Sequence, residues 1–209
     1  QNMYLGPSYS NNEVLKQFKK FNLKKIEVNK QSKYIAGLLK SGKVIALYQN
    51  RMEFGPRALC NRSIICAASD HKINKILNKK LGRTEFMPFA PVVLKNEFKN
   101  LFFPLEKKHK NSHFMTMTFK CKEKSIKRAP AIVHVDKTAR PQIIDKKDNL
   151  RIYNILTEYK KLTGIAVLVN TSFNLHEEPI VCSINDAFRA FKSSKLDYLV
   201  IGNNIFSHK

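Results

Sequence analysis

The sequence lacks several features that would assign a function at once. It has no tryptophan, seven glycines, and no apolar run close to the ~20 residues of a membrane-spanning helix. No P-loop, GxGxxG, HExxH, GxSxG or kinase signature occurs. The chain begins at Gln1 with no initiator methionine and no basic-then-apolar leader. We therefore expect a piece of a longer cytoplasmic protein that has no membrane partner.

Metal-binding and disulfide patterns are missing as well. The four cysteines form no CxxC pair, which argues against a disulfide framework and against a cysteine metal site. His176, Glu177 and Glu178 are adjacent and cannot all face one ion, so we do not interpret them as metal ligands. The cysteines are Cys60, Cys66, Cys121 and Cys182.

Acidic residues are few beside the basic ones. The chain has 38 Lys and Arg against 16 Asp and Glu, and its net charge of +22 predicts an anionic partner. Thirty of the cations are lysines spread along the chain, which is typical of a solvated surface. Arginine grips phosphate and carboxylate with a bidentate fork that lysine lacks. Five of the eight arginines lie in the polar segments described below: Arg51, Arg57, Arg62, Arg83 and Arg140.

Helical and strand patterns alternate without an internal repeat, which favours an α/β fold. We interpret residues 1–30 as an N-terminal arm or a connector to another domain, and residues 31–209 as a single domain. Predicted helices cover 10–20, 34–39, 70–81, 152–162 and 185–191. Predicted strands cover 23–28, 44–48, 114–119, 132–136, 165–169 and 196–201.

The segment 51–63 has the densest cluster of polar side chains. It follows the buried strand predicted at 44–48, and Gly55-Pro56 forces a turn. Ligands of open α/β sheets bind beyond the carboxyl ends of strands, so a ligand site is expected here. The alternative is a surface loop in which Glu53 pairs with a neighbouring arginine. The candidates are Arg51, Glu53, Arg57, Asn61, Arg62 and Ser63.

Two further segments combine charge with rigid or strand-like sequence. The segment 83–91 holds Arg83, Phe86 and two prolines, and it is either a wall of a site or only a stiff crossover. In 134–142, His134 and Asp136 would share one face of the predicted strand, with Arg140 after a turn. This set suits an anion or a metal-bound nucleotide, and the alternative is a plain His–Asp hydrogen bond.

A fourth polar segment, 170–174, follows the most strand-like run of the chain. Its hydroxyl and amide groups can hold phosphate or polarise a carbonyl, although the same residues also favour a capped turn. The candidates are Asn170, Thr171, Ser172 and Asn174.

Taken in this order, these segments resemble the C-terminal domain of the O-carbamoyltransferases of nodulation-factor and antibiotic biosynthesis. The likeness runs from residue 5 to about residue 205. It rests on Leu-Gly-Pro-Ser at 5–8, Arg-Met-Glu-Phe-Gly-Pro-Arg-Ala-Leu at 51–59, Asn-Arg-Ser at 61–63, Pro-Phe-Ala-Pro at 88–91, His-Val-Asp at 134–136, Thr-Ala-Arg-Pro-Gln at 138–142, Asn-Thr-Ser-Phe-Asn at 170–174 and Glu-Pro-Ile-Val at 178–181.

The resemblance implies a YrdC-like twisted mixed sheet with flanking helices. It implies that the domain takes carbamoyl phosphate and ATP, with Mg²⁺, and forms carbamoyl-adenylate with loss of pyrophosphate. A separate N-terminal domain, which binds the acceptor and holds a metal, would pass the carbamoyl group to a substrate hydroxyl.

The resemblance also suggests roles for the candidates. Both substrates are polyanions, so fixed cations must offset their repulsion, and Arg57, Arg62, Arg83 and Arg140 are expected to do so. Ser172 would hold phosphate or the carbamoyl carbonyl. His134 and Asp136 are expected to orient an arginine or place Mg²⁺, and Glu53 to fix Arg57 or Arg51. Phe86 and Phe89 would form a wall against the adenine, and Thr138 would bind substrate.

Three departures from the family pattern leave alternatives open. Many members have glycine at the positions of Cys60 and Glu177, and arginine at the position of Met87. The loss of that arginine favours, as one alternative, a scaffold that binds nucleotide without turnover. The other alternative is a basic RNA-binding module of YrdC-like fold, but dispersed lysines and the lack of an aromatic-basic motif argue against nucleic acid.

Overall fold

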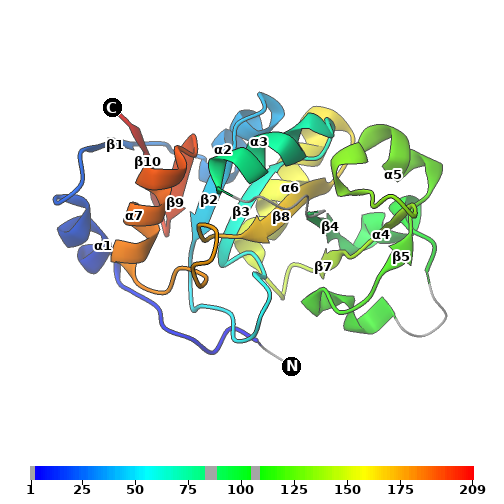
Figure 1. Cartoon of the computed structure of the whole chain (residues 1–209), viewed down its shortest axis with the longest axis horizontal. Helices are drawn as coiled ribbons and strands as arrows, with labels where there is room; N and C mark the ends of the chain where they lie inside the picture. The colour runs from blue at the N-terminus through cyan, green and yellow to red at the C-terminus, as the bar shows by residue number, and fades with distance from the viewer. Residues whose placement is uncertain (1–2, 83–88, 105–108) are drawn as a thin grey trace.

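Apolar runs of the sequence become the central strands of one mixed sheet. The computed structural model describes residues 3–82, 89–104 and 109–209. Eight strands in the order β1-β10-β9-β2-β3-β8-β4-β7 form the sheet (Figure 1). Every residue of the central strand β2 is buried. The strands are β1 (Leu23–Ile26), β2 (Ile45–Tyr48), β3 (Arg62–Ala67), β4 (Ala90–Leu94), β7 (Gln142–Ile144), β8 (Val167–Ser172), β9 (Tyr198–Ile201) and β10 (Asn204–His208).

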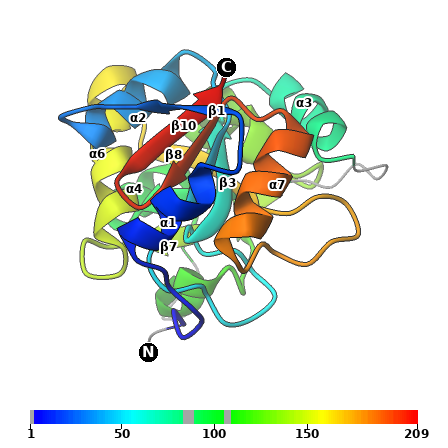
Figure 2. The same ribbon diagram turned by 90° about the vertical axis from the view of Figure 1, so that its left-hand side faces the viewer.

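Helices cover both faces of the sheet. α2 (Gln31–Lys40) and α6 (Leu150–Thr163) pack together on one face, and α3 (Lys72–Lys80) and α7 (Ile184–Ser194) lie on the other (Figure 2). α6 ends as predicted at Gly164, which has a φ of 75°, a left-handed conformation that glycine adopts without strain. The remaining elements are α1 (Asn11–Phe18), α4 (Lys95–Leu101), η1 (His109–Phe114), β5 (Phe119–Lys120), α5 (Glu123–Arg128), η2 (Pro130–Ile132) and β6 (Thr138–Ala139).

Residues of the predicted arm are built into the sheet. β1 pairs antiparallel with β10, with Leu23 opposite His208. The Phe18 ring lies 4.7 Å from that of Phe206, and the Phe21 ring lies 4.9 Å from that of Phe188. The further role of residues 1–30 as a connector stays a prediction.

Three local predictions are wrong. Residues 114–119 form the end of η1 and the start of β5, and residues 132–136 form the end of η2 and a turn. Alternation at 132–136 imitates a strand, but Pro130 starts the 3₁₀ turn and Lys137 at φ 61° closes the next one. α7 is capped by Ser183 rather than by residues 185–186.

The α/β prediction is confirmed, because one buried apolar cluster joins the strands to the helices on both faces. Among the described helices, none has the length and apolar character needed to cross a bilayer.

Candidate active site

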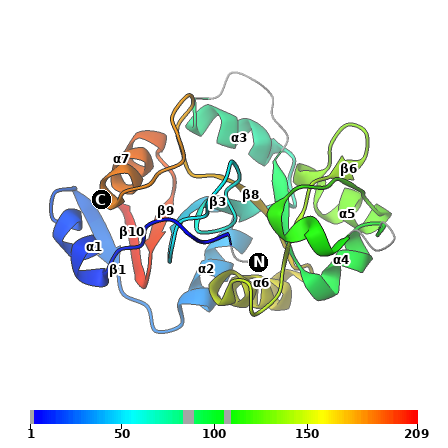
Figure 3. The same cartoon turned by 90° about the horizontal axis from the view of Figure 1, so that it is seen from below.

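Three of the four predicted polar segments meet at one edge of the sheet. β2 and β8 both run antiparallel to β3, so both end where β3, β4 and β7 begin. The β2–β3 loop, the residues before β7 and the turn after β8 therefore converge there, and Figure 3 looks onto this edge. Ser63 pairs with Ser172 across β3 and β8, which brings the first and fourth predicted segments into contact.

Glu53 organises the β2–β3 loop. Its side chain is 3% exposed, and its Oε1 accepts hydrogen bonds from the backbone amides of Leu59, Asn61 and Arg62, the last two at 3.1 Å. Among the described ion pairs, none involves Glu53. The expectation that Glu53 fixes a neighbouring arginine is therefore wrong. Its carboxylate instead accepts from three backbone amides and so fixes the conformation of the loop.

Arg62 is fully buried beneath the same loop. Its guanidinium carbon lies 3.6 Å from the centroid of the Tyr48 ring. Nη1 donates to the carbonyls of Gln49 at 2.7 Å and Asn61 at 2.9 Å, and Nη2 donates to the carbonyl of Pro7 at 3.1 Å. Burial lowers the pKa of Arg62, and the nearby Tyr48 partly offsets this. Both terminal nitrogens of this guanidinium are bonded inside the protein, where a phosphate ligand had been expected.

Arg51 ties the N-terminal segment to the loop. Nε donates to the carbonyl of Gly6 at 3.0 Å and Nη2 to that of Leu5 at 2.6 Å. The Gly6 amide donates to the carbonyl of Met52 at 2.8 Å. A Cβ at Gly6 would lie 2.8 Å from the Cβ of Met52, so this approach requires glycine.

A buried polar cluster lies between the loop and the central strands. Gln142 Oε1 accepts from Asn170 Nδ2 at 2.9 Å and from Cys60 Sγ at 3.1 Å. Ser63 Oγ accepts from the Cys60 amide at 2.9 Å, and Asn61 Nδ2 donates to the carbonyl of Arg51. Of the expected substrate ligands, Asn61, Ser63 and Asn170 are therefore buried and bonded within the protein.

Two arginines at this edge have no carboxylate partner among the described ion pairs. Arg57 is exposed and Arg140 is half-buried. Burial, followed by the nearby positive charge of Arg57, lowers the pKa of Arg140. The buried Nε of Arg140 has no hydrogen-bond partner among the described residues. Two guanidinium groups that repel each other and have no counter-charge among the described ion pairs are a favourable place for an anion.

His134 and Asp136 lie in a turn beside Arg140 and are joined through Thr138. Thr138 Oγ1 donates to Asp136 Oδ1 at 2.7 Å, and His134 Nδ1 lies 3.1 Å from Thr138 Oγ1. Burial and the charge of Arg140 lower the pKa of His134, and Asp136 acts in the opposite direction. The prediction that one strand presents both side chains is wrong, although His134 does lie close enough to Arg140 for its charge to act on the imidazole.

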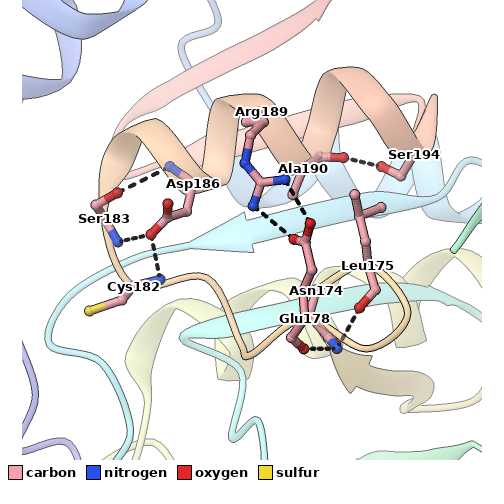
Figure 4. Close-up of polar contacts among 9 residues, drawn as sticks. All are labelled: Asn174, Leu175, Glu178, Cys182, Ser183, Asp186, Arg189, Ala190 and Ser194. Atoms are coloured by element: carbon pink, nitrogen blue, oxygen red, sulfur yellow. Dashed lines mark hydrogen bonds and ion pairs between the residues drawn. The ribbon is translucent and has the colours of Figure 1, made fainter.

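The turn after β8 is fixed to α7. Ser172 Oγ donates to Asn174 Oδ1 at 2.6 Å, and Asn174 Nδ2 donates to the carbonyl of Glu178 at 2.8 Å. Glu178 forms a bidentate pair with Arg189 at 2.7 and 2.8 Å (Figure 4). Ser172, Thr171 and Asn174 are half-buried at the edge, within reach of solvent.

Some of the predicted residues lie in the core or outside the described residues, and one residue of the site was missed. Arg83, Phe86 and Met87 lie outside the described residues. Phe89 is 2% exposed and packs in the core, so its expected place at an adenine is wrong. Gln142 was given no role from sequence, although one amide at the start of an otherwise apolar strand was a signal for it.

Residues 36–208 match the family described as carbamoyltransferase C-terminus. The chain belongs to this family. It is 41% identical over 99% of its length to an uncharacterized protein of Methanocaldococcus jannaschii and covers 40% of that protein. It is 38% identical over 80% of its length to nodulation protein NolNO of Sinorhizobium fredii and covers 25% of it. The chain thus spans less than half the length of these relatives.

Solved structures share the fold at low identity. Full-length HypF in its phosphate- and nucleotide-bound form matches 88% of this chain with a TM-score of 0.60 and 19% identity, over 22% of its own length. P. abyssi Sua5 matches 83% of this chain with a TM-score of 0.54 and 14% identity, over 48% of its own length. The predicted YrdC-like fold is therefore confirmed.

Proposed function

We propose that this chain binds ATP and carbamoyl phosphate at the loop edge of the sheet and forms carbamoyl-adenylate. The observation that carries the proposal is the pair Arg57 and Arg140, which lie at the same edge of the sheet, repel each other electrostatically and have no carboxylate partner among the described ion pairs. Membership of the carbamoyltransferase family supports the kind of reaction, and the structure of HypF in its phosphate- and nucleotide-bound form supports the kind of ligand.

The reaction has two steps. Water first cleaves carbamoyl phosphate into carbamate and inorganic phosphate. A carbamate oxygen then attacks the α-phosphorus of ATP, the bond from that phosphorus to the bridging oxygen breaks, and pyrophosphate leaves. Arg57 and Arg140 hold the phosphates of both polyanions, and Ser172 and Asn174 lie at the same edge to orient the carbamoyl group.

Magnesium fits this site only as a partner of the phosphates. In the described part of the chain, no three His, Cys, Asp or Glu side chains are grouped to hold a metal. Mg²⁺ commonly takes one or two carboxylates and completes its shell with phosphate oxygens and water. Asp136 is the carboxylate that would reach such an ion, which would neutralise phosphate charge.

Completed transfer to a hydroxyl belongs to a further domain in this proposal. The nodulation-protein relatives extend far beyond the part that this chain covers, and the C-terminal family model accounts for most of this chain. The proposed partner is therefore an N-terminal domain that binds the acceptor.

Formation of pyrophosphate that depends on carbamoyl phosphate tests the proposal. Arg140→Gln should lower kcat/KM by on the order of 100-fold, since it removes a bidentate phosphate ligand. Arg128→Gln is the matched control, because Arg128 donates to the Thr163 carbonyl beside Gly164, at the opposite edge of the sheet. Absence of both pyrophosphate and ATP binding by calorimetry in the wild type would overturn the proposal. A steep salt dependence of sub-micromolar RNA binding would favour the nucleic-acid alternative instead.

A further inference from the structure

The buried cluster beneath the site links the three segments that carry the proposed ligands. Cys60 lies three residues after Arg57, Gln142 two residues after Arg140, and Asn170 two residues before Ser172. Cys60, Gln142 and Asn170 are 0%, 1% and 2% exposed, so none of them reaches a ligand in solvent. Each ligand-bearing segment is therefore attached to the cluster at short range.

Gln142 is the centre of this cluster. Its Oε1 accepts from two donors on two other segments, Asn170 Nδ2 at 2.9 Å and Cys60 Sγ at 3.1 Å. Its Nε2 donates to the carbonyl of Leu59 at 3.2 Å, and Asn170 Nδ2 also donates to the carbonyl of Ala58 at 3.2 Å. One amide thus fixes the β2–β3 loop and β8 relative to the start of β7.

The cluster is poorly suited to a purely stabilising role. Asn170 Oδ1 is buried and has no hydrogen-bond partner among the described residues, and Cys60 adopts a φ of 75° that non-glycine residues seldom take. A partly satisfied polar network is less stable than an apolar core of the same shape. A role of the cluster in setting the geometry of the sheet edge that carries the proposed ligands would account for this loss of stability.

We propose that Cys60, Gln142 and Asn170 form a positioning triad that holds Arg57, Arg140 and Ser172 at the spacing required by the two substrates. This inference rests on the proposed function of the site. Misplacement of a substrate-binding group by about 1 Å can lower a rate by on the order of 100-fold, so loss of the triad should act on kinetics more than on folding.

Gln142→Met tests the triad, because methionine has a similar shape and lacks both hydrogen-bonding groups. The expected result is a fall in kcat/KM for pyrophosphate formation by on the order of 10- to 100-fold, whereas the loss of Tm from unsatisfied buried groups is shared with the control below. Asn74→Leu is the matched control, since Asn74 is a buried amide in α3 that donates to Ala131. Its kinetic constants should stay within about twofold of the wild type.

A double-mutant cycle separates positioning from general destabilisation. If Gln142 acts through Arg140, the effects of Gln142→Met and Arg140→Lys should not add, whereas Asn74→Leu and Arg140→Lys should add. If Gln142→Met fails to fold, Cys60→Ala and Cys60→Ser replace it. Alanine and serine both have to adopt the positive φ of this position. Only serine keeps a hydrogen-bond donor to Gln142, so Cys60→Ser should retain activity that Cys60→Ala loses.

The outcomes distinguish this inference from the proposed function. The triad is overturned if the wild type is active and Gln142→Met has the same kinetic constants as Asn74→Leu, or if the effects of the double mutant add. The proposed reaction would still stand after either result. A wild type that neither binds ATP nor forms pyrophosphate overturns both.

Discussion

Tyr48 and Arg62 face each other across β2 and β3, and the guanidinium carbon of Arg62 lies over the Tyr48 ring, 3.6 Å from its centroid. The same guanidinium reaches carbonyls of the loop and of the N-terminal segment. An arginine expected to bind phosphate is therefore the internal support of the loop that carries Arg57.

Replacement of Arg62 by methionine should destabilise the fold strongly. Several buried carbonyls would lose their donor at once, so we expect the free energy of unfolding to fall by at least ~3 kcal/mol. Urea denaturation measures this. Arg128→Met is the control, because exposed Arg128 makes one described hydrogen bond, to the Thr163 carbonyl, and should cost less than about 1 kcal/mol. Equal losses in the two variants would show that the buried bonds of Arg62 contribute little.

The Glu178–Arg189 pair should make stability depend on pH in the acid range. Hydrogen bonds from Arg189 lower the pKa of Glu178 below its ordinary 4.5. The unfolded chain then binds more protons in this range, so the contribution is present above about pH 4.5 and is lost as the pH falls through the lower, folded-state pKa.

Denaturation midpoints measured from pH 7 down to about pH 3 check this, since Glu178→Gln should flatten the acid limb of the curve. Glu123→Gln serves as the control, because Glu123 makes a single surface contact of 3.7 Å with Lys127. Parallel curves for the wild type and Glu178→Gln would contradict the prediction.

Glu177 is an exposed residue held at a φ of 62° in the turn after β8. Glycine adopts this conformation without steric cost, so Glu177→Gly should stabilise the fold by about 0.5–1 kcal/mol. Chemical denaturation with an unchanged m-value would verify it. The neighbouring His176→Gly, at a position without positive φ, should instead lose stability. A destabilised Glu177→Gly would mean that this side chain contributes more than its exposure suggests.

Binding of a polyanion should change the protonation of His134. In the free protein, burial and the charge of Arg140 lower the pKa of His134 below 6.5. A bound phosphate compensates the charge of Arg140 and raises that pKa, so a proton is taken up on binding and affinity increases as the pH falls. Calorimetry of ATP binding in two buffers of different ionisation enthalpy measures the uptake. Undiminished uptake in His134→Gln would assign the proton to another group.

Periodicity and caps predicted much of the fold. Residues 152–162 show a helical repeat and Gly164 ends the helix, while the apolar run at 44–48 is buried in β2 as expected. The two segments that follow buried strands were also expected to carry the site, because strand ends at one sheet edge bring distant residues together. Residues 132–136 show the limit of this reasoning, since local alternation cannot reveal that no strand lies beside them to pair with.

The roles of single side chains at the site were harder to predict. Glu53 and Arg62 act on backbone groups of an irregular loop, and no periodic pattern specifies those partners. The proximity of Arg57 and Arg140 depends on the order of β3, β8, β4 and β7 in the sheet, which is set by contacts far apart in sequence. The sequence thus predicted which arginines lie at this edge, without separating Arg62, which is bonded inside the protein, from Arg57 and Arg140, which have no carboxylate partner among the described ion pairs.

The pairing of β1 with β10 has a consequence for how the protein is made. Leu23 belongs to the first strand of this sheet to leave the ribosome, and its partner His208 leaves only after every other strand of the sheet has been translated. Until then β9 lacks β10 and presents an open strand edge, the kind of surface that draws a growing chain into association with others. Because β10 pairs with both β1 and β9, the interval before β10 is translated is the period in which this domain most needs protection from aggregation.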